Sequence, residues 1–242
     1  MQILSIGNSF SQDAQRYLHD IAKCDGVKIE CFNLMIGGCS LSLHYRNMLS
    51  DAKAYGLEMN GTGVGFKVSL KEALLNRDWD VITIQQFSQE SPDYNTYQPY
   101  LNKLAEYISK CAPKAKLVIH QTWAYEQGCK RVSEEWKYSE HTEMFKDIEM
   151  SYALAAKDVG ADFIIPSGRL FQEILSSGIE KVHRDGFHAS LGIGRYALGL
   201  LWYAMLTGND VSNNKFSDFD EDIPQSHIEI VKECVNRICK RK

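Results

Sequence analysis

The sequence predicts an α/β fold in which a parallel sheet lies between layers of helices. Short apolar runs alternate along the chain with longer segments of helical periodicity, an order that is typical of βαβ units. The chain has 242 residues, of which 44% are hydrophobic and 24% charged, a composition typical of globular proteins. No repeat or low-complexity linker divides it, so we expect a single domain over residues 1–242.

Five short runs are predicted to be the strands of this sheet. Each is rich in Ile, Val, Leu or Phe, and each is short enough to be buried on both faces, as strands of parallel sheets are. They are residues 2–6, 28–33, 81–84, 117–120 and 163–165. Because ligands bind beyond the carboxyl ends of the strands in open parallel sheets, functional residues are expected directly after these runs.

Helices are predicted where apolar residues recur every three or four positions, since this spacing puts them on one face. The predicted helices cover residues 14–22, 97–108, 145–159, 190–207 and 225–240. The last of them has an apolar stripe formed by Ile228, Val231, Val235 and Ile238. We expect this stripe to pack on the sheet. A contact between two copies of the chain is the alternative, so the oligomeric state stays open.

Two segments interrupt the alternation of strands and helices. Residues 55–66 contain Asn60-Gly61, a pair that favours a tight hairpin turn, and we expect a hairpin excursion there. Residues 122–140 form a polar loop that carries aromatic side chains. These are Trp123, Tyr125, Trp136 and Tyr138.

Charge and apolar content argue against two classes of partner. The chain has 27 Lys and Arg against 31 Asp and Glu, so no global basic field attracts nucleic acid. Its longest nearly apolar run, residues 196–206, is shorter than the ~18–20 residues that cross a bilayer. We therefore expect a soluble protein that binds neither nucleic acid nor membrane.

Cysteine usage and the start of the chain favour a cytoplasmic protein. The seven cysteines include no Cys-x-x-Cys pair, which predicts free thiols in a reducing compartment. Residues 1–6 lead straight into a predicted strand without the basic and apolar regions of a signal peptide. A secreted protein whose leader had been removed would look the same, which leaves secretion as the alternative.

Serines follow the first predicted strand, in the segment Gly7-Asn8-Ser9-Phe10-Ser11. A serine at a tight turn from strand to helix holds its hydroxyl clear of the sheet, beside the N–H groups of the helix N-terminus. Ser9 is therefore a candidate nucleophile. The alternative is a helix cap, for which Ser11 is better placed because it directly precedes the helical segment.

A glycine pair, Gly37-Gly38, follows the second predicted strand. Glycine lets the backbone approach a ligand closely and direct an N–H group at it, although a plain turn is the alternative. The pair is not followed by the Gly-Lys-Ser/Thr of a phosphate loop, and no Gly-x-Gly-x-x-Gly opens a helix. A nucleotide site is thus not predicted, and we expect no cofactor.

A histidine and an aspartate stand three residues apart before the predicted helix 190–207. An Asp185 carboxylate beside the His188 ring would fix its tautomer and leave the other ring nitrogen free as a general base. A loop turn at Asp185 with His188 as a helix cap is one alternative. Metal binding by His183, Asp185 and His188 is another, because all three are ligand types.

Taken together, these three blocks resemble those of the SGNH (GDSL-like) hydrolase superfamily over residues 2–207. The resemblance implies a three-layer α/β/α sandwich with a flavodoxin-like, five-stranded parallel sheet and ester hydrolysis by a serine nucleophile. It assigns Ser9 as nucleophile and gives its N–H, with that of Gly38, to the oxyanion. It also assigns His188 as base and Asp185 as the carboxylate that orients it.

The third block departs from the family pattern. The family has Gly-x-Asn-Asp after its third strand, with the Asn as an oxyanion donor, whereas this chain has Gln85-Gln86-Phe87-Ser88-Gln89-Glu90. A glutamine amide offers the same N–H group on one extra methylene. Gln86 is the first choice for this donor and Gln89, nearer in register to the missing Asn, is the second.

The sequence therefore predicts a serine ester hydrolase that removes a short acyl group, acetyl first, from a carbohydrate. The aromatic side chains of residues 122–140 favour a sugar, since rings stack on sugar faces, and the expected substrate contacts are Asn8, Trp123 and Tyr125. A carbohydrate-binding domain without catalysis and a metal-dependent hydrolase are the alternatives. Because the general base must be neutral, kcat/KM is expected to fall on acidification around pH ~6–7.

Overall fold

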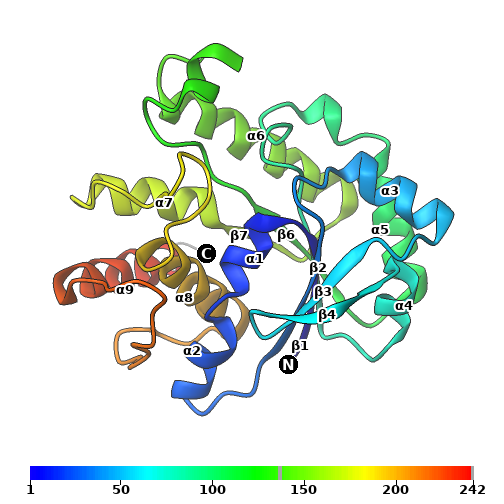
Figure 1. Ribbon diagram of the computed structural model, residues 1–242, viewed down its shortest axis with the longest axis horizontal. Coiled ribbons are helices and arrows are strands. Elements are labelled where there is room, and N and C mark those ends of the chain that lie inside the picture. Colours follow the sequence, from blue (N-terminus) through cyan, green and yellow to red (C-terminus); the bar gives the residue numbers. More distant parts are fainter. Residues whose placement is uncertain (136–137, 241–242) are drawn as a thin grey trace.

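A sheet of seven strands forms the centre of the computed structural model, which describes residues 1–135 and 138–240 (Figure 1). The strands lie in the order β4-β3-β2-β1-β5-β6-β7. Their bounds are β1 Gln2–Gly7, β2 Glu30–Met35, β3 Tyr55–Met59, β4 Thr62–Val68, β5 Val81–Ile84, β6 Lys116–Gln121 and β7 Phe163–Pro166. The predicted α/β class is thus confirmed, and each of the five predicted strands is present within two residues of its expected bounds.

The five predicted strands pair in parallel, in the order β2-β1-β5-β6-β7. The two further strands come from the predicted excursion, which is a hairpin whose strands pair antiparallel at the β2 edge. Its turn has Asn60 at φ 50° and Gly61 at φ 77°. A Cβ on Gly61 would lie 2.4 Å from the carbonyl oxygen of Arg16, so only glycine allows the hairpin to approach that segment so closely.

Helices cover both faces of the sheet (Figure 1). One face carries α1 Ser9–Gln15, α2 Leu18–Cys24, α7 Ser167–Ser176, α8 Ile193–Thr207 and α9 Gln225–Cys239, and the other carries α3 Leu41–Ser50, α4 Leu70–Leu75, α5 Tyr100–Cys111 and α6 His141–Val159. The short helices η1 Tyr94–Thr96 and η2 Arg131–Glu135 lie in loops. This is the three-layer arrangement that the resemblance implied.

The first helical segment differs from its prediction. A single helix was expected over residues 14–22, but the structure has α1 and α2, separated at Arg16 and Tyr17. Helix α1 begins five residues earlier than expected because Asn8 caps it.

Helix α8 is the central helix of its layer, with 11 of its 15 residues buried. It separates α9 from the sheet. The apolar stripe of α9 is buried against α8 and α7 rather than on the sheet, so the expected packing partner was wrong. This burial also leaves the stripe unavailable for the alternative contact with a second copy. In the described residues, no helix combines the length and the apolar character needed to cross a membrane.

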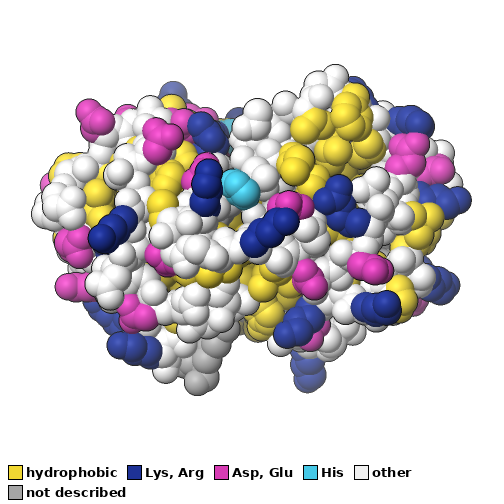
Figure 2. Space-filling view, turned by 90° about the horizontal axis from the view of Figure 1, so that it is seen from below, with side chains coloured by type: hydrophobic (Ala, Val, Ile, Leu, Met, Phe, Trp, Pro, Cys, Tyr) yellow, Lys and Arg dark blue, Asp and Glu magenta, His cyan; other side chains and the backbone are white. Residues whose placement is uncertain are grey.

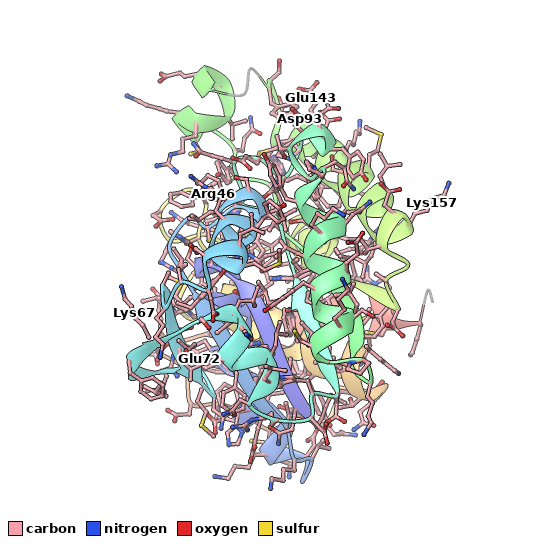
Figure 3. The ribbon with its side chains drawn as sticks, turned by 90° about the vertical axis from the view of Figure 1, so that its right-hand side faces the viewer. Arg46, Lys67, Glu72, Asp93, Glu143 and Lys157 are labelled. Carbon is pink, nitrogen blue, oxygen red and sulfur yellow. The ribbon has the colours of Figure 1, made fainter. Side chains whose placement is uncertain are left out.

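The two ends of the sheet have different surroundings. Figure 3 shows Asp93 and Glu143 at the end where the parallel strands finish, whereas Glu72 and Lys67 lie nearer the other end. Near this second end a groove of about 360 Å³ lies between the hairpin and α4, and Leu57, Phe66 and Trp79 are among its lining residues. Figure 2 shows hydrophobic side chains gathered on the face of the molecule seen from below. The sites predicted from the sequence lie at the first end.

Candidate active site

The turn after β1 places Ser9 at the first position of α1. The Asn8 side chain accepts a hydrogen bond from Phe10 N at 3.0 Å, and Ser11 Oγ accepts one from Asn8 N at 3.1 Å. Asn8 and Ser11 therefore form a reciprocal cap, which leaves the Ser9 hydroxyl free of capping. The alternative of Ser9 as a cap is excluded by this geometry. The expectation of Ser11 as the residue that precedes and caps the helix was wrong, because Asn8 is the N-cap and Ser11 lies inside α1 as its third residue.

A tight loop before α8 carries the histidine and the aspartate. Ser190 N donates to Val182 O at 2.8 Å, which closes the loop at its base. Within it, Asp185 Oδ1 accepts from the backbone N–H groups of His188 at 2.8 Å and Phe187 at 3.3 Å. These bonds hold the aspartate under the histidine ring.

Ser9, His188 and Asp185 are joined by two hydrogen bonds. His188 Nδ1 lies 2.7 Å from Asp185 Oδ2, and His188 Nε2 lies 2.9 Å from Ser9 Oγ. An ionised carboxylate only accepts, so Nδ1 donates and Nε2 accepts from the serine O–H. Partial burial raises the pKa of Asp185, but the hydrogen bonds from the His188 ring and backbone outweigh it and lower that pKa below its ordinary value. The structure thus brings together all three residues predicted for the triad.

The loop after β2 brings Gly38 to the same end of the sheet. Gly38 is exposed and has φ 62°, a left-handed conformation that favours glycine, in a turn closed by Cys39 N donating to Ile36 O at 3.1 Å. Asn8 Nδ2 donates to Cys39 O at 3.1 Å and so ties this turn to the start of α1. The N–H of Ser9 has no acceptor within its helix, as is general at the first helical position.

Gln86, the first choice for the third oxyanion donor, does not direct its amide at the site, and this prediction was wrong. Gln86 is fully buried, and its Nε2 donates to both the carbonyl and the hydroxyl oxygen of Thr96 at 3.1 Å. Its Oε1 accepts from Leu41 N and Phe87 N. Both N–H groups of the amide are therefore used inside the protein. Gln89, the second choice, lies half-buried in the turn that follows and stays a prediction.

Asn8 supports the site from beneath rather than facing substrate. It is only 1% exposed, which contradicts the expected substrate contact. Besides capping α1, its Oδ1 accepts from Gln85 Nε2 at 2.8 Å, and Gln85 Oε1 accepts from His120 Nδ1 at 2.5 Å. Complete burial lowers the pKa of His120 to about 3, so its ring is neutral. We did not predict this network of Asn8, Gln85 and His120, although Gln85 follows a predicted strand directly.

The expectation of exposed aromatic rings at Trp123 and Tyr125 was wrong. Both residues are 0% exposed. Trp123 stacks on Phe10 at a centroid distance of 4.1 Å, and its Nε1 donates to Phe187 O at 2.7 Å. Tyr125 OH is hydrogen-bonded to Ser88 Oγ at 3.0 Å. The two rings therefore pack beneath the loops that carry the site and offer no face to a sugar.

The rest of the aromatic loop gives no sugar platform in the described part of the chain. Tyr138 OH donates to Asp147 Oδ2 at 2.6 Å, and its ring packs against the core. Trp136, which the sequence also singled out, lies outside the described residues.

The position of His183 argues against the alternative of a metal site formed by His183, Asp185 and His188. Its ring is buried, stands edge-on to Phe171 and lies with Nε2 at 3.1 Å from Ala124 O. Burial lowers the pKa of His183 to about 4. Among the residues described, no cluster of three His, Cys, Asp or Glu side chains is arranged to hold a metal ion.

Fold and site together define an α/β/α protein with the architecture of the SGNH hydrolases and a hydrogen-bonded Ser-His-Asp triad. The chain belongs to the DUF4886 family, a domain of unknown function whose sequence profile matches residues 2–234. It is similar to the crystal structure of a DUF4886 family protein from Bacteroides uniformis, with 33% identity, a TM-score of 0.92 and coverage of 98% of this chain and 93% of that one.

Two more distant structures share the fold. A candidate SGNH hydrolase from Slackia heliotrinireducens has 23% identity and a TM-score of 0.61, over 85% of this chain and 98% of that one. An acetylxylan esterase from Geobacillus stearothermophilus has 14% identity and a TM-score of 0.53, over 82% and 90%. Among curated proteins, no sequence matches the chain.

Proposed function

We propose that the protein is a serine ester hydrolase that removes a short acyl group through an acyl-enzyme intermediate. The observation that carries the proposal is the unbroken chain of hydrogen bonds from Asp185 through His188 to Ser9, with lengths of 2.7 and 2.9 Å. A serine hydroxyl is a weak nucleophile at neutral pH and needs a base within hydrogen-bond reach, which this geometry provides.

In the proposed mechanism, Ser9 Oγ attacks the acyl carbon while His188 Nε2 takes its proton. The same ring then gives the proton to the leaving alcohol, and water attacks the acyl-enzyme with His188 again as base. Asp185 stabilises the imidazolium that forms in each half of the reaction. The oxyanion is stabilised by the N–H groups of Ser9 and Gly38 and by the amide of Gln89, which replaces Gln86 in this role.

The substrate we propose is an acetylated carbohydrate. One structural neighbour is named an acetylxylan esterase, and another, from Sinorhizobium meliloti, a carbohydrate acetylesterase. The position of Phe87 favours a small acyl group. Its ring lies against Gly38, the proposed oxyanion donor, because a Cβ on Gly38 would lie only 3.4 Å from it. An acyl group whose oxygen accepts from the Gly38 N–H would bind next to this ring, which would leave room for a short acyl chain only. The buried Trp123 and Tyr125 no longer contribute to the argument.

Hydrolysis of p-nitrophenyl acetate and of acetylated xylan tests the proposal. Wild type should hydrolyse both, prefer acetyl to longer acyl esters, and react with a fluorophosphonate probe at Ser9. Ser9→Ala should abolish turnover and labelling, whereas Ser176→Ala, which removes an exposed serine of α7, should leave both unchanged. Equal rates for wild type and Ser9→Ala would remove the serine from the mechanism.

Two outcomes of this experiment would favour the alternatives. Binding of xylan fragments without turnover or labelling would indicate a carbohydrate-binding domain. Activity that a strong chelator abolishes would indicate a metal-dependent hydrolase, whereas the proposed mechanism predicts no effect of the chelator.

A further inference from the structure

A buried carboxylate lies one helical turn beyond the proposed nucleophile. Asp13 is 0% exposed, and its oxygens accept hydrogen bonds from Arg184 Nη1 at 2.9 and 3.0 Å and from Arg195 Nε at 2.9 Å. Asp13 Oδ2 also accepts from the backbone N–H of Ala189 at 3.2 Å. None of these groups has a chemical role in the proposed reaction. A buried carboxylate is unfavourable unless it is paired, and this one is paired on several sides.

Two partners of this carboxylate flank the loop that carries the base. Arg184 directly precedes Asp185, and Ala189 directly follows His188. The Arg184 guanidinium also donates to the Ala189 carbonyl, and Arg184 N donates to His188 O at 3.0 Å. The buried carboxylate thus holds both ends of the four-residue segment between its two partners, and it does so from the helix that begins at Ser9.

We propose that Asp13 is a positioning residue that fixes the His188 loop at the distance from Ser9 needed for proton transfer. This inference rests on the proposed function, because it concerns the geometry of the same site. Asp13 touches none of the reacting atoms. It acts by joining the helix of the nucleophile to the loop of the base, and a displacement of about 1 Å between reacting groups costs about 100-fold in rate.

Asp220 provides a matched control within the same chain of charges. It accepts from Arg195 Nη1 at 2.8 Å and from Arg16 Nε at 2.8 Å, so its removal also breaks charged hydrogen bonds around α1. Its hydrogen bonds in the described part of the chain do not reach residues 184–189. Asp220→Asn therefore perturbs the network without releasing the loop.

The first experiment compares kcat and KM of Asp13→Asn and Asp220→Asn with p-nitrophenyl acetate. We expect Asp13→Asn to lower kcat by about 100-fold with nearly unchanged KM, and to slow fluorophosphonate labelling of Ser9 by a similar factor. Asp220→Asn should keep nearly wild-type kcat, even where its melting temperature falls as much as that of Asp13→Asn. A folded Asp13→Asn protein with wild-type kcat would overturn the inference.

A second pair of variants, at Arg184, tests the positioning role of Asp13 in the event that Asp13→Asn does not fold. Arg184 makes its contacts with Asp13 and Ala189 through one nitrogen, Nη1, so a lysine ammonium can replace it. Arg184→Lys should retain most of the rate, and Arg184→Met should lose about 100-fold. Equal rates for the two overturn the inference. A wild-type protein that neither hydrolyses ester nor reacts with the probe overturns the proposed function and the inference with it.

Discussion

Replacement of Asp185 by asparagine tests the proposed mechanism through the protonation of one ring. An asparagine whose carbonyl oxygen takes the place of Oδ1 still accepts from the N–H groups of Phe187 and His188, so the loop keeps its shape. Its NH2 group then faces His188 Nδ1, where the wild-type carboxylate oxygen lies at 2.7 Å. Because the NH2 group donates, Nδ1 has to accept, and the ring proton moves to Nε2.

The expected loss follows from this change of tautomer. With its proton on Nε2, the His188 ring donates to Ser9 Oγ across the 2.9 Å contact and cannot take the serine proton. The same substitution in a protease triad lowers kcat by about 10⁴-fold, equal to about 5.4 kcal/mol of activation free energy. The Asp185 side chain is 45% exposed, and water weakens its hold on the ring. We therefore expect a smaller loss, of about 10³-fold in kcat.

The assay is the steady-state hydrolysis of p-nitrophenyl acetate by purified wild type and Asp185→Asn. Asp210→Asn is the control, because Asp210 is an exposed aspartate that likewise accepts a bond from a backbone N–H, that of Ser212. The control should keep wild-type kcat. A value of kcat for Asp185→Asn within about tenfold of wild type would refute the role of the carboxylate in fixing the tautomer.

Three further predictions concern the support of the site. The pKa of His120 is lowered to about 3, so its contribution to stability is complete above its unfolded pKa of ~6.5 and is lost as the pH falls from there towards 3. Urea unfolding should show wild type losing about 2 kcal/mol more than His120→Asn between pH 7 and pH 5. Trp123→Phe leaves the Phe187 carbonyl without its donor and should lower the unfolding free energy by ~1–3 kcal/mol, with unchanged KM for acetylated xylan; a raised KM would restore the sugar-stacking role. Gly38→Ala places a side chain at φ 62° and turns away the proposed oxyanion donor, so kcat should fall by about 100-fold, and an unchanged kcat would contradict that role.

Much of the fold could be predicted because its signals are local. Four of the five parallel strands, β1, β2, β5 and β6, have most of their residues buried, which makes each a short apolar run whatever its neighbours are. The edge strand β7 is only partly buried, but it is apolar as well. The Asn60-Gly61 turn likewise needs left-handed backbone at both positions, and this requirement marks the hairpin in the sequence. The packing of α9 was not predictable in this way, since its stripe records only that one face is buried and not which element covers it.

The residues of the site likewise divide into those that a local sequence motif marks and those whose orientation depends on distant segments. Ser9, Gly38 and the Asp185 and His188 pair lie directly after predicted strands or before a predicted helix, so their positions follow from short motifs. The direction of the Gln86 amide depends instead on Leu41 and Thr96, which come from other parts of the chain.

Burial of Trp123 shows the same dependence on distant segments. The residues around it are polar, and this favoured exposure, but rings from α1 and α7 enclose it. Asp13 was missed although it shares a helix with Ser9 at a spacing of four. Its neighbours Gln12 and Gln15 are polar, and the helix was predicted to begin only at residue 14, so no signal in the sequence indicated that this carboxylate is buried.

The proposed nucleophile Ser9 and the proposed base His188 are 179 positions apart in the sequence. Ser9 lies near the start of the chain, and His188 lies just before α8. During synthesis, the growing polypeptide acquires its attacking group long before the base that activates it. Turnover by this mechanism begins only after the late helices have docked on the early strands. The rate of ester cleavage therefore measures the fraction of molecules in which the segments of Ser9 and His188 have come together, and it provides a direct assay of refolding yield.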